Sequence, residues 1–426
     1  MTPDWSPHPR YRLYTRPVSY AAALKSLLPG AVRRTETTAR LEEEICLRHG
    51  ARAALCVPMA RTGLYLALRE MIRPGQMVIM SPLTVVDVVN MVLLAGGVPV
   101  FADILRQSCG IDPAEVDSLI DHRTGAVLIT HLHGESADAH LLRGICRARG
   151  VPLIEDAAQA FGAVENGRRL GTIGELGIYS LGVYKNINAW RGGVLVSPDA
   201  ALIDKIRRRM DRWPELPARR LLGAALRGLL TDLATWPPFF ASFTYGVVRY
   251  GYLHDIRAIN RRLDPEYGAM RLSTIPSDYL GRMTGTLAEL AIGQLDRIDA
   301  DTEARIRRAA RYHEGLAGLD ALITPRRREK RAHIYTSYPI QHPRRNALLR
   351  YALARGRDFA AQHLRNCADL PEFNEYYRDC PNARAASREL ILLPTYPCYP
   401  MQEVERNIRI IRDFVRSEGP SELAEN

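Results

Sequence analysis

Apolar runs and amphipathic segments alternate along the first half of the chain. The pattern between Arg40 and His49 predicts an amphipathic helix, which is followed by the apolar run "AALCVP" and by "GLYLALREMI", a stretch with helical periodicity. The alternation continues through "MVIMSP", "VVDVVNMVLLAGG" and "VPVFADI", and then through "GAVLITHLHG", "AHLLRGICRARG" and "VPLIEDAA". Strands and helices at this spacing predict an α/β fold with a mostly parallel central sheet sandwiched by helices.

Ligands of such sheets bind at the carboxyl ends of the strands, so the residues that end each run are the candidates for chemistry. They are Arg61 and Thr62, Thr84, His131 to Gly134, Asp156, Ser180 and Lys185. A lysine for a Schiff base, a carboxylate for a pyridine nitrogen, and hydroxyls with helix amides for a phosphate are what pyridoxal phosphate needs. For Lys185 alone, the alternative is a lysine at the end of a buried strand whose ammonium reaches water.

Three longer stretches make this interpretation specific. The chain carries "IEDAAQAFGA", then "GTIGELGIYSLGVYKN", then "RGGVLVSPD". Together they resemble the signature of the DegT/DnrJ/EryC1/StrS family, fold-type-I pyridoxal phosphate enzymes that mostly aminate nucleotide-linked keto-sugars. The resemblance covers about residues 36 to 205 and 280 to 415, and includes "THLHG", "LAELAIGQLDRID" and "CPNARAASRELILLP".

The resemblance implies a role for each matching residue. Lys185 matches the Schiff-base lysine, and Ser180 matches the phosphate-binding serine. Asp156 matches the partner of the pyridinium nitrogen, and Gln159 matches a glutamine on the side of the 3-hydroxyl. The family's phosphate turn falls on Ala60, Arg61 and Thr62, where Arg61 adds a positive charge; the alternative for Arg61 is a structural role in the turn.

Three positions depart from the family pattern. Val85 stands where an aromatic residue often stacks on the cofactor, so stacking is either lost or supplied by His131 or His133; a structural role remains the alternative for each histidine. Arg191 replaces an acidic residue before Gly-Gly, and Leu280 replaces an asparagine that reaches the phosphate of the partner subunit. These differences predict an unusual acceptor.

The matching residues imply transamination. A branch of the family that dehydrates sugars has histidine in place of the lysine, so Lys185 favours amino transfer. By resemblance the donor is glutamate, and the freed Lys185 amine acts as the general base on its α-proton. Because an amine must be unprotonated to accept a proton, we expect burial to lower the pKa of Lys185.

The stretch between Trp213 and Ser277 is longer than the corresponding connection in typical relatives. It predicts a helix with leucines on one face and arginines nearby, followed by aromatic residues: Leu222, Leu226, Leu229, Leu230 and Leu233; Arg219, Arg220 and Arg227; Trp236, Phe239, Phe240, Phe243 and Tyr245. One interpretation is contact with a membrane surface or an amphiphile through residues 219–250. The other is a helix packed on its own domain or on a dimer partner.

Composition narrows the function classes. The net charge of +11 and the pI near 9.4 suit anionic partners, but the arginine clusters lack the aromatic interleaving of a nucleic-acid platform, so we expect no nucleic acid. The seven scattered cysteines form no C-x-x-C pair, which argues against a disulfide framework or a metal site. With no secretory signal pattern and no long apolar run, we expect a cytoplasmic protein, with peripheral membrane contact as the alternative.

The domain organisation that we expect is an N-terminal arm (1–35), a large cofactor domain (36–275) and a smaller C-terminal α/β domain (276–426), in which "HIYTSYPIQHP" supplies a strand. By resemblance the protein is a homodimer. Three functions remain open: transamination of a keto-sugar or related ketone, the same chemistry on a lipid-linked or amphiphilic acceptor, and a non-catalytic regulatory or scaffold role.

Overall fold

The computed structural model describes residues 6–13, 15–25, 34–261, 270–329 and 331–417. Its centre is a seven-stranded sheet in which only the strand Gly193–Ser197 runs antiparallel to its neighbours. In spatial order the strands are β1 (Ala53–Val57), β10 (Gly193–Ser197), β9 (Leu176–Ser180), β6 (Leu153–Asp156), β5 (Thr124–Thr130), β2 (Met77–Met80) and β4 (Val98–Phe101). The predicted mostly parallel sheet is confirmed.

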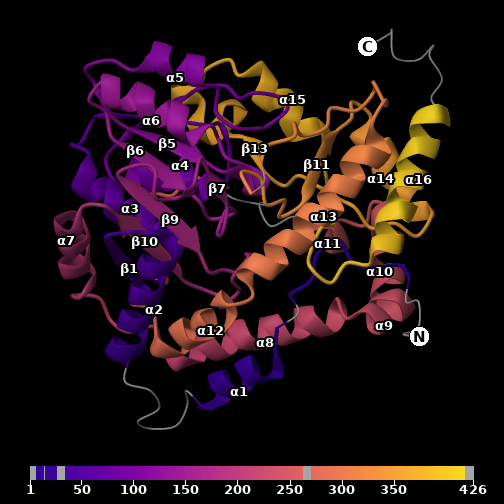
Figure 1. Ribbon diagram of the computed structural model, residues 1–426, viewed down its shortest axis with the longest axis horizontal. Helices are drawn as coiled ribbons and strands as arrows, with labels where there is room; N and C mark the ends of the chain where they lie inside the picture. The colour runs from indigo at the N-terminus through magenta and orange to yellow at the C-terminus, as the bar shows by residue number, and fades with distance from the viewer. Residues whose placement is uncertain (1–5, 14, 26–33, 262–269, 330, 418–426) are drawn as a thin grey trace.

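Helices cover both faces of this sheet (Figure 1), and a hydrophobic core lies on each face. Alternate residues of β1 point to opposite faces: Ala54 and Cys56 belong to one core, Leu55 and Val57 to the other. One face is covered by α2 (Arg34–His49), α5 (Pro113–Leu119), α6 (Ala139–Ala148) and α12 (Gly285–Leu295). The other is covered by α3 (Ala60–Met71), α4 (Val86–Leu94) and α7 (Ala200–Met210).

The C-terminal part forms a smaller α/β unit with its own core. Its antiparallel sheet has the order β11 (Tyr338–Gln341), β14 (Leu390–Leu393), β12 (Ala360–Ala361), and it packs with α13 (Ile298–Leu316), α14 (Arg345–Ala354) and α16 (Met401–Ser417). The strand expected in "HIYTSYPIQHP" is β11. Between β12 and β14 the chain returns to the large unit, where β13 (Arg365–Asn366) pairs with β3 (Leu83–Thr84).

Shorter elements connect these layers. They are a 3-10 turn η1 (Leu132–Gly134), the ribbon of β7 (Val164–Glu165) and β8 (Arg168–Arg169), the 3-10 turns η4 (Cys367–Asp369) and η5 (Pro371–Tyr376), and the helix α15 (Pro381–Glu389).

The stretch after Trp213 folds as an added helical segment that starts in the lower part of Figure 1 and continues toward its lower right. It contains α8 (Ala218–Ala234), α9 (Pro237–Phe239), a π-helical turn η2 (Phe240–Thr244), α10 (Tyr245–Leu253) and α11 (Arg257–Asn260). The N-terminal helix α1 (Pro17–Lys25) packs against α8, and Tyr20 stacks on Trp190 with ring centroids 5.3 Å apart. The predicted helix of the added segment is therefore present as α8.

Candidate active site

A cavity of about 880 Å³ opens at the carboxyl ends of the parallel strands. Five of the residues predicted for the cofactor line it: Arg61, Val85, Asp156, Ser180 and Lys185. Four of them lie at or beside an element end, because Asp156 ends β6, Ser180 ends β9, Arg61 is the second residue of α3 and Val85 precedes α4. The sheet topology thus brings residues that are distant in sequence to one place.

Lys185 lies on the connection from β9 to β10. Side chains of other elements fix this connection: Gln294 of α12 accepts from the Asn188 N–H (3.0 Å) and donates to the Asn188 carbonyl (2.9 Å). The Asn186 side chain donates to the carbonyl of Phe161 (3.0 Å). Sequence reasoning missed Gln294, although a glutamine in the apolar run "LAELAIGQL" is a signal, because a buried amide needs partners.

The electrostatics of the cavity shift two pKa values in opposite directions. Burial lowers the pKa of Lys185, Asp156 opposes this shift, and the positive charge of Arg61 adds to it. Burial raises the pKa of Asp156, while the Ala158 N–H (3.0 Å), Lys185 and His131 offset part of the rise. The lowered pKa that the sequence predicted for Lys185 is confirmed in direction, so a larger share of this amine is unprotonated at neutral pH than for an exposed lysine.

Groups that suit a phosphate lie near Lys185. The Ser180 hydroxyl lines the cavity and accepts from the Gly182 N–H (3.3 Å). Arg61 lines the cavity as well, but its guanidinium forms an ion pair with Asp87 and donates to the Tyr279 hydroxyl (3.1 Å). The charge of Arg61 is therefore already balanced by an acidic neighbour.

Three other predicted residues do not line the cavity. Thr62 is buried and its hydroxyl donates to the carbonyl of Tyr279 (3.2 Å). The Gln159 side chain accepts from the His133 N–H (3.0 Å). His131 is fully buried with both ring nitrogens engaged, one with Glu155 (3.1 Å) and one accepting from the Ala137 N–H (3.1 Å). His131 was expected to contact the cofactor, but it does not line the cavity, and its backbone N–H donates to the Asp156 carbonyl (3.0 Å).

His133 also lies outside the cavity lining. It is 3% exposed, and burial lowers its pKa to about 3, so the ring is neutral. Where the family often has an aromatic residue, Val85 lines the cavity together with Val88 and Leu64, and Trp190 adds an indole ring. Apolar side chains thus line part of the cavity, and Trp190 is an aromatic residue that the sequence pattern did not single out.

The segment around Leu280 lies beside the phosphate turn of its own chain. In addition to the bonds of Tyr279 with Arg61 and Thr62, the Tyr279 hydroxyl donates to Asp87 (2.9 Å). Arg191 donates to the carbonyl of Asp278. Both departures from the family pattern, Arg191 and Leu280, are therefore located at this side of the cavity.

The added segment supplies another wall. Arg219, Arg220, Gly223, Ala224 and Arg227 of α8 line the same cavity. Sequence reasoning placed these arginines on the helix but did not predict that they reach the cavity, because the helix pattern does not say against which element it packs.

Comparison with known proteins identifies the family of this chain. The model of the DegT/DnrJ/EryC1/StrS aminotransferase family matches residues 19–214 and 258–412. The chain belongs to this family. It is a pyridoxal-phosphate-dependent aminotransferase, as the resemblance implied.

Individual relatives have low sequence identity to the chain but match most of its length. The chain is 27% identical to the spore coat polysaccharide biosynthesis protein SpsC of Bacillus subtilis, over 88% of this chain and 89% of that protein. It is 26% identical to the UDP-4-amino-4-deoxy-L-arabinose–oxoglutarate aminotransferase of Shewanella sediminis, over 89% and 90%. The fold is that of the sugar aminotransferase CalS13 from Micromonospora echinospora, with a TM-score of 0.73 and 21% identity over 95% and 99% of the two chains.

One part of this family member lies outside the match. Residues 215–257, between the two matched ranges, hold α8, α9, η2, α10 and the first residue of α11. This gap lies within the longer stretch predicted as added between Trp213 and Ser277, and the α8 wall lies outside the matched ranges.

The residues present fit the cofactor of the family. A half-buried lysine of lowered pKa, a carboxylate of raised pKa and a hydroxyl line one cavity. Lys185 would hold the aldehyde carbon, Asp156 the ring nitrogen, and Ser180 with Arg61 the phosphate.

Proposed function

We propose that this aminotransferase moves an amino group from glutamate to the ketone of a nucleotide-linked sugar. The names of relatives support the sugar, because SpsC is named for polysaccharide biosynthesis and the Shewanella protein for a UDP-linked amino sugar. The latter name includes oxoglutarate, the keto acid of glutamate. The observation that carries the proposal is that Lys185, Asp156 and Ser180 line one cavity near the upper end of the roughly 300–1,000 Å³ typical of small-molecule sites.

The residues of the chain divide the work. Pyridoxal phosphate, when bound, supplies an electron sink for the carbon that loses its proton. Lys185 takes the α-proton of the donor at Nζ and returns a proton, a role that its lowered pKa favours. Asp156 would hold a negative charge at the ring nitrogen of the bound cofactor, and the Ser180 hydroxyl would hold its phosphate. Val85, Val88 and Trp190 exclude water from part of the cavity.

The test combines absorption spectra with chemical trapping. In the wild type we expect a visible band of lysine-bound cofactor that glutamate converts to the shorter-wavelength band of the aminated cofactor. Borohydride reduction followed by peptide mass spectrometry should place the cofactor on Lys185. Lys185→Ala should lose the trapped peptide and slow the reaction with glutamate by about 10²- to 10⁴-fold or more.

Lys205→Ala is the matched control, because Lys205 is an exposed lysine of α7 away from the cavity. The variant should behave as the wild type. Trapping on another lysine, or undiminished reaction of Lys185→Ala with glutamate, would refute the assignment.

A second candidate places the same chemistry on an amphiphilic acceptor at a membrane surface. It is favoured by exposed apolar side chains of the added segment, which include Leu226, Leu229, Leu233 and Phe243. Among the described residues, no helix combines the length and apolar character needed to span a bilayer, so any such contact would be peripheral.

A further inference from the structure

The face of α8 that lines the cavity is cationic. Arg219, Arg220, Gly223, Ala224 and Arg227 repeat at a spacing of three to four residues, which places them on one side of the helix. Glycine and alanine keep the middle of this face low, so the long arginine side chains border an open space. The helix lies in the range that the family model does not match.

The acidic groups near the cavity do not balance these arginines. Asp156 is the acidic partner of Lys185, Asp87 pairs with Arg61, and Asp278 lies 3.8 Å from Arg220. Among the described residues, the guanidinium groups of Arg219 and Arg227 form no hydrogen bond or ion pair; the Thr231 hydroxyl donates to the backbone carbonyl of Arg227 (2.8 Å). Because cationic side chains that face one cavity repel one another, this arrangement favours an anionic ligand.

Arg191 extends the cationic surface. It lines the same cavity, and its Nε–H is buried without an acceptor within the described part of the chain. A buried donor without an acceptor is costly, and a ligand oxygen would satisfy it.

We propose that α8 binds a diphosphate group of the acceptor through Arg219 and Arg227, with Arg191 as a further donor. The inference rests on the proposed function, because it names the acceptor chemistry of that same site. Guanidinium groups form paired hydrogen bonds with phosphate oxygens, and two or three of them suit a group with several such oxygens. The diphosphate belongs either to a nucleotide or to a lipid carrier.

The experiment measures anion binding to the holoenzyme without turnover. Inorganic pyrophosphate is titrated by calorimetry into the wild type and into Arg219→Gln/Arg227→Gln. We expect the double variant to bind at least about tenfold more weakly, with a smaller dependence on salt. The reaction with glutamate is followed by absorption on the same proteins, as a separate readout of the donor step.

Arg249→Gln/Arg257→Gln is the matched control. Both arginines are exposed on the same added segment, outside the cavity lining, and their replacement removes the same charge. Its pyrophosphate affinity should stay within twofold of the wild type. UDP and farnesyl diphosphate, titrated in parallel, identify the source: tighter binding of one than of pyrophosphate assigns the diphosphate to a nucleotide or to a lipid.

Three results would overturn the inference. They are a wild type that does not bind pyrophosphate, an equal loss in both double variants, and a slower glutamate reaction with pyrophosphate binding intact, which would assign the arginines to the carboxylates of the donor. Failure of the proposed function is distinct, because it would appear as absence of the Lys185-bound cofactor or of the glutamate reaction in the wild type.

Discussion

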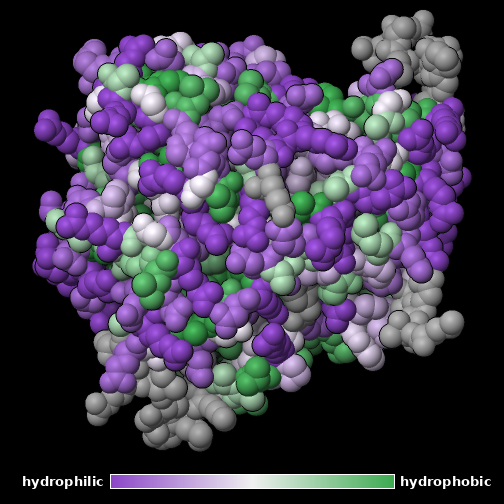
Figure 2. All heavy atoms as spheres, viewed as in Figure 1, coloured by the Kyte–Doolittle hydropathy of each residue, from purple (hydrophilic) through white to green (hydrophobic). Residues whose placement is uncertain are grey.

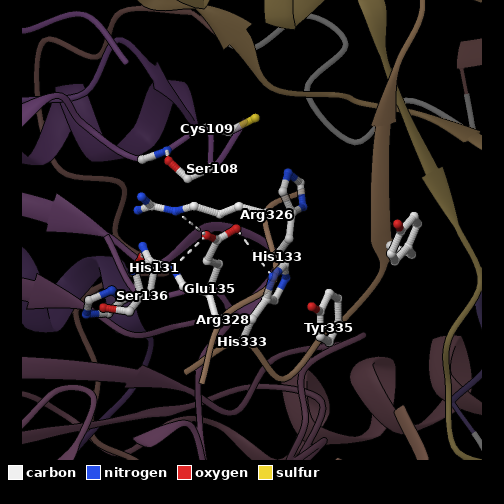
Figure 3. A network of polar contacts seen from close by, with 12 residues as sticks. Ser108, Cys109, His131, His133, Glu135, Ser136, Arg326, Arg328, His333 and Tyr335 are labelled. Atoms are coloured by element: carbon white, nitrogen blue, oxygen red, sulfur yellow. Dashed lines mark hydrogen bonds and ion pairs between the residues drawn. The ribbon is translucent and has the colours of Figure 1, made fainter. Parts of the chain in front are cut away.

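Glu135 is a buried carboxyl group that joins the two units of the molecule. Its side chain is 2% exposed and lies 3.0 Å from Arg328 and 3.3 Å from His333 (Figure 3). Burial raises the pKa of Glu135 to about 7, and the nearby Arg328 and Arg326 oppose this rise. His333 stays neutral because burial lowers its pKa well below the ordinary value. Backbone hydrogen bonds join the same two segments: the Ile334 N–H donates to the Gly134 carbonyl (2.9 Å).

The raised pKa predicts a pH-dependent stability. The folded chain binds this proton more tightly than the unfolded chain, whose carboxyl titrates near 4.5, so the contribution is fully present below about pH 4.5 and is lost as pH rises through 7. Glu135→Gln cannot titrate. Its stability relative to the wild type should therefore increase between pH 5 and pH 8, by up to about 3 kcal/mol.

The measurement is denaturant unfolding of both proteins at several pH values. Glu314→Gln, at an exposed position of α13, is the control and should keep a constant offset from the wild type. A constant offset for Glu135→Gln would show that its carboxyl titrates alike in the folded and unfolded chains.

Individual site residues were predictable only where chain direction decides their position. Lys185, Asp156 and Ser180 end or follow parallel strands, so topology alone brings them together. The sequence does not say that the adjacent Glu155 points away from the cavity and accepts from His131 and from the N–H groups of Gly171, Ile173 and Gly174. These partners lie far from Glu155 in the sequence, so no local sequence pattern predicts the hydrogen bonds.

At the scale of elements, α8 packs with one leucine and three small residues inward. Leu221, Ala224, Ala225 and Gly228 are buried, whereas Leu226, Leu229, Leu230 and Leu233 are exposed. The amphipathic pattern predicted the helix, yet the leucine stripe usually marks the buried side. Here the indole of Trp190 occupies the space beneath α8, so only a small residue fits above it. The antiparallel direction of β10 could not be predicted either, because the periodicity of a strand carries no information on its direction.

The contact between Gly228 and Trp190 can be tested by adding one methyl group. A Cβ at position 228 would lie 2.7 Å from the Nε1 atom of Trp190 and 3.0 Å from its Cδ1 atom. Alanine for glycine within a helix ordinarily stabilises by about 1 kcal/mol, but overpacking of this size costs about 1–3 kcal/mol. We expect Gly228→Ala to lower the thermal midpoint and to weaken cofactor retention, because Trp190 lines the cavity.

Gly246 of α10 is the matched position, since a Cβ there meets nothing within 4 Å. Gly246→Ala should leave the midpoint unchanged or raise it. If Gly228→Ala were as stable as Gly246→Ala and retained the cofactor equally well, α8 would not rest on Trp190 in solution.

At the scale of the whole molecule, exposed apolar side chains concentrate on the added segment. Of the 18 large hydrophobic residues that are exposed in the described chain, nine lie between Leu226 and Tyr250. The face in Figure 2 is largely hydrophilic, and apolar side chains reach its lower edge, where Figure 1 places α1 and α8. The α8 helix packs on its own domain through Leu221, Ala224, Ala225 and Gly228, as one interpretation of the sequence expected, but its outer leucines are exposed. A membrane surface and a second copy of the chain remain the candidate partners of this outer face.

We expect the membrane to be the partner, because the exposed arginines Arg249 and Arg257 lie on the same segment and suit anionic lipid. The wild type should sediment with phosphatidylcholine vesicles that contain phosphatidylglycerol, and less with phosphatidylcholine alone. Leu229→Ser/Leu233→Ser/Phe243→Ser should reduce the bound fraction by at least about tenfold, since each buried side chain contributes about 1.5–3 kcal/mol.

Leu47→Ser/Leu141→Ser, at exposed apolar positions of α2 and α6, is the control and should bind vesicles as the wild type does. Light scattering of the same proteins measures whether they form dimers, and this distinguishes a membrane surface from a second copy of the chain as the partner. A wild type that ignores vesicles and forms dimers, together with a triple variant that is monomeric, would assign this face to a second copy. In that case the leucines of α8 would serve assembly, and the amphiphilic acceptor would lose the observation that favours it.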